Sequence, residues 1–297
     1  MERSAYRHCT LCPRLCGVDR LAGERGFCGM PAGAFAARAA LHFWEEPVLC
    51  ANGGAGAVFF SGCTLRCKFC QNYEISRDAF GISLDAGKLR ACFERLIEDG
   101  ASCIDLVTPT HFLPEILPAL TPKLPVPVVY NCGGYETVET LQQLEGLVDV
   151  YLPDFKYSDP ALAGKLSGAP DYPGIAKEAL LEMYRQTGAF RVENGQLVSG
   201  VLIRHLILPG EIDNSLGVID WIADSFPKHG VLVSLMSQYA PTDTVANLPP
   251  YDRKITRDEY DAVLSWLQFR GLWDGFTQDL CAASLDFVPE FDGTGLC

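Results

Sequence analysis

Short apolar runs alternate along the chain with segments whose apolar residues recur every three or four positions. The short runs are typical of buried strands, and the longer spacing is typical of amphipathic helices. Six strands are predicted, over 57–60, 104–107, 125–130, 147–152, 201–208 and 231–236. Helices are predicted between and after them, over 89–97, 114–120, 138–144, 175–186, 214–222 and 256–267. This alternation indicates parallel βα units.

Several residues mark where the predicted helices begin and end. Thr256 and Glu259 have the spacing of a capping box, Asn214 is placed to cap a helix, and Gly100 ends one. Residues 34–43 are rich in alanine and permit either a helix or a strand. Polar residues follow the strands, where α/β barrels carry their chemistry. The sequence therefore predicts an incomplete parallel α/β barrel preceded by a small Cys-rich segment.

Composition limits the classes of function. With 297 residues and 48% apolar content, the chain can bury a sizeable core. Its net charge of −13 argues against a nucleic-acid partner and against an anionic membrane surface. The sequence contains no apolar stretch of about 18 residues, the length that a transmembrane helix needs. The first residues lack a secretory apolar region, so we expect a cytoplasmic protein.

Three closely spaced cysteines follow the first predicted strand. Cys63, Cys67 and Cys70 have the spacing C-x3-C-x2-C, so their sulfur atoms can point at a common centre. A cubane iron–sulfur cluster has four irons that usually take one thiolate each, so three thiolates leave one iron free. A structural zinc site would need a closed set of four ligands. The alternatives are a zinc knuckle and three buried structural cysteines.

Four further cysteines lie in the first thirty residues: Cys9, Cys12, Cys16 and Cys28. This segment has too few large apolar residues to fold alone, so a metal site is predicted. Structural zinc and a second iron–sulfur cluster both suit four thiolates, and four unligated thiols are the alternative. An odd total of 13 cysteines fits metal ligation better than disulfides. The others are expected to fill the core: Cys50, Cys92, Cys103, Cys132, Cys281 and Cys297.

Taken together, these motifs resemble the radical S-adenosylmethionine (SAM) superfamily over nearly the whole chain. The resemblance is nearest to proteins related to pyruvate formate-lyase activating enzyme, in their PflX-type branch. The motifs that carry it are C-x2-C-P-R-x-C, FFSGC with CQN, LVTPTH, YLPDFKY, RHLILPG and LMSQY.

The resemblance implies a [4Fe–4S] cluster on Cys63, Cys67 and Cys70 whose open iron binds the amino and carboxylate groups of SAM. One electron then splits SAM into methionine and a 5′-deoxyadenosyl radical, which abstracts a hydrogen atom. The resemblance also implies cofactor contacts from Phe69, Thr108, Thr110, His111, Asn131, Asp154, Lys156 and Arg204. Among these, Phe69 would lean on the adenine, and Arg204 would pair with the SAM carboxylate.

The chain departs from the family pattern at two places. The segment 108–111, Thr-Pro-Thr-His, stands where Gly-Gly-Glu-Pro normally holds the methionine amino group. Either Gln238 or Tyr239 stands where the formate-lyase activator has a histidine. Asp154 and Lys156 also permit a simpler interpretation as an ion pair on a loop.

The resemblance implies an oxidoreductase that converts a glycine of a partner enzyme to a glycyl radical, with a flavodoxin- or ferredoxin-like reductant. One alternative is radical SAM modification of another peptide or a small molecule, and a second is a non-catalytic zinc or electron-transfer iron–sulfur protein. We expect a connector over 31–56, a barrel over 57–270 and an extension over 271–297 that packs on the barrel. Closure of the barrel by that extension would favour a small substrate over a partner enzyme.

Overall fold

The computed structural model describes residues 1–51, 53–78, 80–280 and 288–296. Its parallel strands are β2 (Ala55–Phe60), β4 (Cys103–Val107), β5 (Val128–Cys132), β6 (Val150–Pro153), β8 (Gln196–Leu206), β9 (Leu232–Met236) and β10 (Gly275–Thr277). Its antiparallel strands are β1 (Ala34–His42), β3 (Ile82–Leu84) and β7 (Arg191–Glu193).

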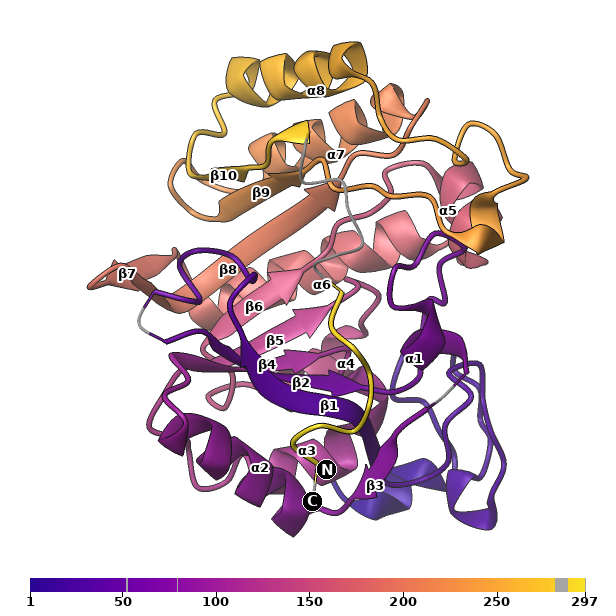
Figure 1. Cartoon of the computed structure of the whole chain (residues 1–297), viewed down its shortest axis with the longest axis vertical. Coiled ribbons are helices and arrows are strands. Elements are labelled where there is room, and N and C mark those ends of the chain that lie inside the picture. The colour runs from indigo at the N-terminus through magenta and orange to yellow at the C-terminus, as the bar shows by residue number, and fades with distance from the viewer. Residues whose placement is uncertain (52, 79, 281–287, 297) are drawn as a thin grey trace.

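These strands form one sheet in the order β10-β9-β8-β6-β5-β4-β2-β1-β3, and β7 pairs with β8. Figure 1 shows the sheet curving without closing, with β10 near one end and β3 near the other. The predicted incomplete parallel α/β barrel is confirmed. All six predicted strands are present, with ends that shift by a few residues. The alanine-rich segment 34–43 is a strand, and it pairs antiparallel with β2.

The predicted helices are also present: α2 (Ala86–Glu98), α3 (Leu113–Ala119), α4 (Val138–Gln142), α6 (Tyr172–Thr187), α7 (Ile212–Ser225) and α8 (Arg257–Phe269). They cover the outer face of the sheet (Figure 1). The capping box of Thr256 and Glu259 is confirmed. The predicted cap at Asn214 is wrong, because α7 begins at Ile212 and the Asn214 amide oxygen accepts a hydrogen bond from the Ser158 amide at 2.8 Å.

The sequence pattern missed several short elements. They are α1 (Tyr73–Arg77), α5 (Pro160–Ser167), β3, β7, β10 and the 3-10 turns Arg3–Tyr6, Arg20–Ala22, Thr110–Phe112 and Asp243–Val245. A helical period needs a window of about 11 residues, and the missed strands β3, β7 and β10 have three residues each. Over the part of the chain that the structure describes, none of the helices combines the length and apolar character needed to cross a membrane.

The inner face of the barrel is filled at the amino ends of the strands. Leu49, on the segment after β1, is fully buried among apolar residues of the strands, which include Cys103, Val129, Val150 and Leu202. The Cys103 thiol contacts the Leu49 carbonyl at 3.5 Å. Because this end is packed solid, space for a ligand is left at the carboxyl ends of the strands. The predicted core residues Cys281 and Cys297 lie outside the described residues.

Both terminal segments pack on the barrel. The buried Arg20 guanidinium donates to the carbonyls of His111 and Pro31, each at 2.7 Å, and so joins the Cys-rich segment to the sheet. Near the other end, the chain runs along β1, where the Ala39 amide donates to the Thr294 carbonyl at 2.9 Å. Figure 1 shows this last segment, in yellow, crossing in front of the sheet.

Candidate functional site

The loop that carries the three closely spaced cysteines leaves β2 at its carboxyl end. Gly62 starts the loop with φ of +79°, and a Cβ there would lie 2.8 Å from the Cys28 carbonyl oxygen. A residue with a side chain would therefore be strained at this position. Arg14 fastens the loop from outside, because its Nε donates to the Thr64 carbonyl at 2.8 Å.

Polar hydrogens surround the sulfur atoms of this loop. The backbone amides of residues 65 and 66 lie 3.4 and 3.5 Å from the Cys63 sulfur. The Ser167 hydroxyl, at the end of α5, donates to the Cys67 sulfur at 3.0 Å. Hydrogen bonds of this kind stabilise thiolates in metal clusters and tune their potential.

The loop encloses one cavity together with the carboxyl ends of the strands. The cavity has a volume of about 250 Å³. Nine of the predicted site residues line it: Cys63, Cys67, Cys70, Phe69, Thr108, Asn131, Asp154, Lys156 and Arg204. The structure thus brings together residues that lie up to 141 positions apart in the sequence, the separation of Cys63 and Arg204. We call this space the inner cavity.

The cysteines of the inner cavity fit a cluster with three protein ligands. Burial, together with the charges of Cys67 and Cys70, raises the pKa of Cys63 to about 12. Buried sulfurs that disfavour one another's ionisation need positive charge to be held as thiolates, and a metal cluster provides it. Cys132 also lines the cavity, but the charged groups that act on it most strongly are Glu136 and Asp154 rather than the three loop cysteines.

Arg204 reaches into the inner cavity from β8 and is held by three acceptors. Its guanidinium donates to Asp154 at 2.9 Å, to Glu45 at 3.1 Å and to the Asn131 amide oxygen at 2.7 Å. Lys156 donates to the other Asp154 oxygen at 2.6 Å. Burial alone would raise the pKa of Asp154, but Arg204 and Lys156 together lower it. Asp154 and Lys156 therefore form an ion pair, and both line the cavity.

The structure does not bring Thr110 and His111 to the cavity. Thr110 is buried and donates to Glu136 at 2.9 Å, and a His111 ring nitrogen lies 2.7 Å from the Ser61 carbonyl oxygen. Burial lowers the pKa of His111 to about 3, so this ring is neutral. Within the segment 108–111, Thr108 lines the cavity, with a φ of +61°. The geometry gives Thr110 and His111 packing partners and no access to a ligand there.

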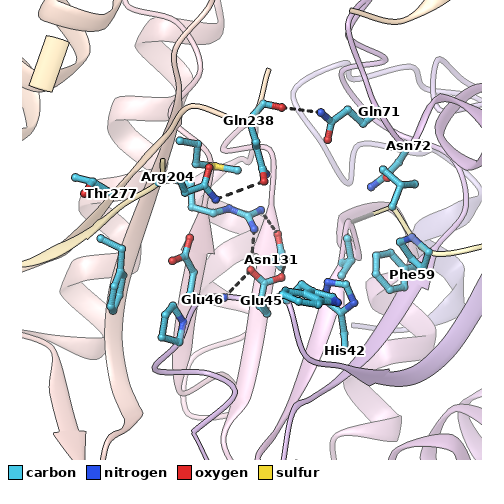
Figure 2. A pocket seen from close by; sticks show the side chains of 18 residues that line it. His42, Glu45, Glu46, Phe59, Gln71, Asn72, Asn131, Arg204, Gln238 and Thr277 are labelled. Atoms are coloured by element: carbon cyan, nitrogen blue, oxygen red, sulfur yellow. Dashed lines mark hydrogen bonds and ion pairs between the residues drawn. The ribbon is translucent and has the colours of Figure 1, made fainter. Parts of the chain in front are cut away.

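A second cavity of about 360 Å³ adjoins the inner one, and we call it the outer cavity. Seven residues line both: Gln71, Asn72, Val107, Asn131, Arg204, Met236 and Gln238. Segments far apart in the sequence complete the outer cavity: His42, Trp44, Glu45, Glu46, Pro47, Phe59, Phe276, Thr277, Gln278, Val288 and Pro289. Figure 2 shows Glu45, Glu46, Asn131 and Arg204 clustered on one side and Phe59 and Asn72 on the other.

Sequence reasoning missed Glu45 and Glu46 as site residues. They lie on the segment that follows β1, which the sequence pattern assigned to a connector. Two adjacent acids before Pro47 were a weak signal. Of the two residues that could replace the activator histidine, Gln238 lines both cavities, whereas the buried Tyr239 hydroxyl donates to the Tyr251 carbonyl at 2.6 Å.

The N-terminal cysteines form a separate group. Cys9, Cys12 and Cys28 are buried and Cys16 is exposed. Burial raises the pKa of Cys28, and Arg20 opposes this effect. Across residues 1–51, 53–78, 80–280 and 288–296, no three His, Cys, Asp or Glu side chains are arranged to hold a single metal ion. The N-terminal thiols are therefore not positioned as a formed zinc site. In a four-iron cluster each thiolate binds a different iron, so the thiolates need not converge on one ion as they do around zinc.

Comparison with known proteins places the chain in a family. An alignment of 274 residues, at 30% identity, matches the uncharacterized protein MJ0674 of Methanocaldococcus jannaschii and covers 89% of this chain and 75% of that protein. The chain belongs to the MJ0674 family. No protein-family model matches this member of the MJ0674 family.

A solved structure shows that the MJ0674-family fold occurs elsewhere. The crystal structure of SuiB from Streptococcus suis, bound to the precursor peptide SuiA, is similar with a TM-score of 0.51 and 14% identity. The match covers 74% of this chain and 48% of SuiB, so the chain spans about half the length of SuiB. The shared fold agrees with the predicted incomplete α/β barrel.

Proposed function

We propose that this MJ0674-family protein is a radical SAM enzyme, which cleaves SAM reductively and uses the 5′-deoxyadenosyl radical to abstract a hydrogen atom. The observation that supports it most is the enclosure of Cys63, Cys67 and Cys70 with polar strand ends in one cavity. The carboxyl ends of barrel strands are where such folds carry their active sites. The fold shared with SuiB supports the same proposal.

The chain's own residues have separable roles in this proposal. A bound [4Fe–4S] cluster would supply the electron that splits SAM. Cys63, Cys67 and Cys70 would hold that cluster. Phe69, whose ring centroid lies 6.0 Å from that of Tyr239, would offer an apolar surface to the adenine. The walls of the inner cavity would exclude water that could otherwise react with the radical.

The polar residues of the inner cavity would orient the methionine part of SAM. Arg204 and Lys156 provide positive charge for a carboxylate, and Asn131 provides an amide. Arg204 already contacts the carboxylates of Glu45 and Asp154. We propose that these two carboxylates hold its guanidinium in place while the guanidinium attracts the carboxylate of SAM. Burial disfavours the charged form of Arg204, but Asp154 and Glu45 raise its pKa, and it stays a cation.

The substrate is the finer part of the proposal. The resemblance implies a glycine of a partner enzyme. Residues 276–278 and 288–289, from the C-terminal part of the chain, form part of the wall of the outer cavity. Because this wall limits the space, the outer cavity favours a small molecule or a single peptide side chain. SuiB was crystallised with a precursor peptide, so its fold accommodates a peptide. Deuterium transfer from a labelled candidate into 5′-deoxyadenosine would discriminate between these substrates.

An anaerobic assay of 5′-deoxyadenosine tests the proposed reaction. The protein is reconstituted with iron and sulfide, reduced, and mixed with SAM. Wild type should release 5′-deoxyadenosine, and Cys67→Ala should release none. Cys92→Ala, which changes a buried cysteine on α2 away from both cavities, is the matched control and should behave as wild type. Equal product from the wild type and Cys67→Ala would overturn the proposal.

For the N-terminal cysteines we propose a second metal, zinc or iron–sulfur, that binds with a local rearrangement. The charges of Cys28 and Cys9 both act on Cys12, so these sulfurs are near one another. Metal analysis of a variant that lacks Cys63, Cys67 and Cys70 isolates this site. Metal that remains in that variant and disappears after Cys12→Ala would support the proposal, and no metal in either would oppose it.

A further inference from the structure

We infer that the outer cavity binds a cationic nitrogen of the substrate, an ammonium or guanidinium group. The inference rests on the proposed function only for the statement that the bound cation belongs to the substrate. Binding of the cation itself needs neither the cluster nor SAM. The cation can belong to a free amine or to a lysine or arginine side chain of a peptide. Both present the same chemistry to the cavity.

One side of the outer cavity carries Glu45 and Glu46, and on that side carboxylates outnumber cations (Figure 2). Glu45 pairs with Arg204 at 3.1 Å. The Asn131 amide lies 3.4 Å from Glu45 and 3.3 Å from Asp105, so it holds two carboxyl groups close together. Glu46 lines the same wall and is 8% exposed. Among the described residues of this lining, Arg204 is the one lysine or arginine, and a carboxylate of the inner cavity shares it.

One buried polar atom beside these acids, Oδ1 of Asp105, has no hydrogen-bond partner among the described residues, and the Asp105 side chain is 0% exposed. Alternate residues of a strand share a face. Asp105 therefore faces the same way as Val107, which lines the outer cavity. A buried acceptor without a donor is costly, so a donor brought to this wall by a ligand would be stabilising.

The electrostatics agree with this geometry. Burial raises the pKa of Glu46 and of Asp105, and the charge of Glu45 raises that of Asp105 further. Positive charge from an ammonium group would oppose both shifts, and the same group supplies hydrogen-bond donors. An anionic substrate would add a charge of the same sign.

The opposite wall is aromatic. His42 and Phe59 line it (Figure 2), and their rings meet edge to face at 6.0 Å. Burial lowers the pKa of His42, so the neutral ring does not repel a cation. Aromatic faces attract cationic groups, and they pack well against the methylene chain that carries such a group. The cavity thus combines an acidic end with an apolar wall, as a long-chain amine requires.

The shared lining sets where the reacting carbon would lie. Asn131 and Arg204 belong to both cavities, so a cation held beside Glu45 and Glu46 leaves its carbon chain next to the inner cavity. There a substrate carbon–hydrogen bond would break homolytically: the hydrogen atom would join the 5′ carbon of the deoxyadenosyl radical, and one unpaired electron would remain on the substrate carbon.

Binding of simple probes to the full chain tests the inference. The probes are n-pentylamine, Nα-acetyl-lysine-N-methylamide and hexanoate, followed by ligand-observed NMR titration. We expect at least one amine to bind and hexanoate to bind at least about tenfold more weakly, because loss of a charge-assisted hydrogen bond costs about that factor or more. The amine that binds more tightly identifies the source, free amine or peptide side chain. Hexanoate binding as tightly as the amines, or no amine binding, would overturn the inference.

Variants of Glu46 locate the probe. Glu46→Gln removes the charge and keeps the shape, and it should weaken amine binding about tenfold. Glu46→Asp keeps the charge and should retain part of the affinity. Glu98→Gln, at the exposed end of α2, is the matched control and should bind as wild type. Unchanged amine affinity in Glu46→Gln would overturn the inference, and unfolding curves show whether each variant is folded.

The outcomes separate this inference from the proposed function. Amine binding without 5′-deoxyadenosine formation would support a cationic substrate and refute the proposed radical reaction. Formation of 5′-deoxyadenosine without any preference for amines would support the reaction and refute the inferred substrate class.

Discussion

Replacing Glu136 by glutamine probes a buried network behind the inner cavity. Glu136 is 2% exposed and accepts hydrogen bonds from the Thr110 hydroxyl at 2.9 Å and the Tyr130 hydroxyl at 3.3 Å. Burial raises its pKa from 4.5 to about 8, although both hydroxyls oppose the shift. The group is therefore a neutral acid over much of the neutral pH range.

The sign of the pH dependence follows from the raised pKa. The contribution of Glu136 to stability is fully present below pH 4.5 and is lost as the pH rises through about 8. A shift of this size corresponds to about 4–5 kcal/mol as an upper bound. Glutamine stays neutral, and the two hydroxyls can rotate to donate to its oxygen or accept from its amide. Relative to Glu136→Gln, the wild type should therefore lose up to several kcal/mol of unfolding free energy on going to alkaline pH.

Urea unfolding between about pH 5 and about pH 9 measures this difference. Glu139→Gln, at an exposed site in the first turn of α4, is the control and should parallel the wild type. A constant difference between the wild type and Glu136→Gln across the whole pH range would refute the reasoning, because it would mean that the folded-state pKa of Glu136 is not raised.

Three further substitutions test other parts of the account. Ser167→Ala removes a hydrogen bond to a loop sulfur and should make the midpoint potential of a bound cluster more negative, on the order of tens of millivolts, in an EPR redox titration. Ser83→Ala, at an exposed position of β3, is the control and should leave that potential unchanged. Thr256→Ala breaks the capping box and should cost about 1 kcal/mol in urea unfolding. Arg204→Met leaves the half-buried Glu45 without its cation and Asp154 with Lys156 alone, and should cost up to about 3 kcal/mol. Adding Glu45→Gln to that variant should recover part of the loss.

Apolar periodicity was sufficient to predict the barrel. Strands such as β4 and β5 are buried on both faces, so they are nearly continuous apolar runs between turns. The cysteine loop was predictable because its ligands are close in sequence. Short elements such as α5 were not, since α5 has only eight residues and ends at Gly168 in a left-handed conformation.

The composition of the cavities was harder to predict. Asn131 and Arg204 follow from the resemblance, and the structure places both in the lining. The contribution of Glu45 depends on where the segment after β1 enters the barrel, and only tertiary packing determines that. Thr110 illustrates the opposite error, because the turn after β4 directs its hydroxyl to a buried carboxyl group instead of the cavity.

The measurement that most directly tests the central claim is EPR spectroscopy of the reduced, reconstituted protein with and without SAM. If Cys63, Cys67 and Cys70 hold a cluster with one open iron beside the inner cavity, SAM should change the cluster spectrum of the wild type. The change should persist in Cys12→Ala and disappear in Cys67→Ala. A four-iron spectrum that SAM leaves unchanged in the wild type, or a spectrum that survives intact in Cys67→Ala, would contradict the account.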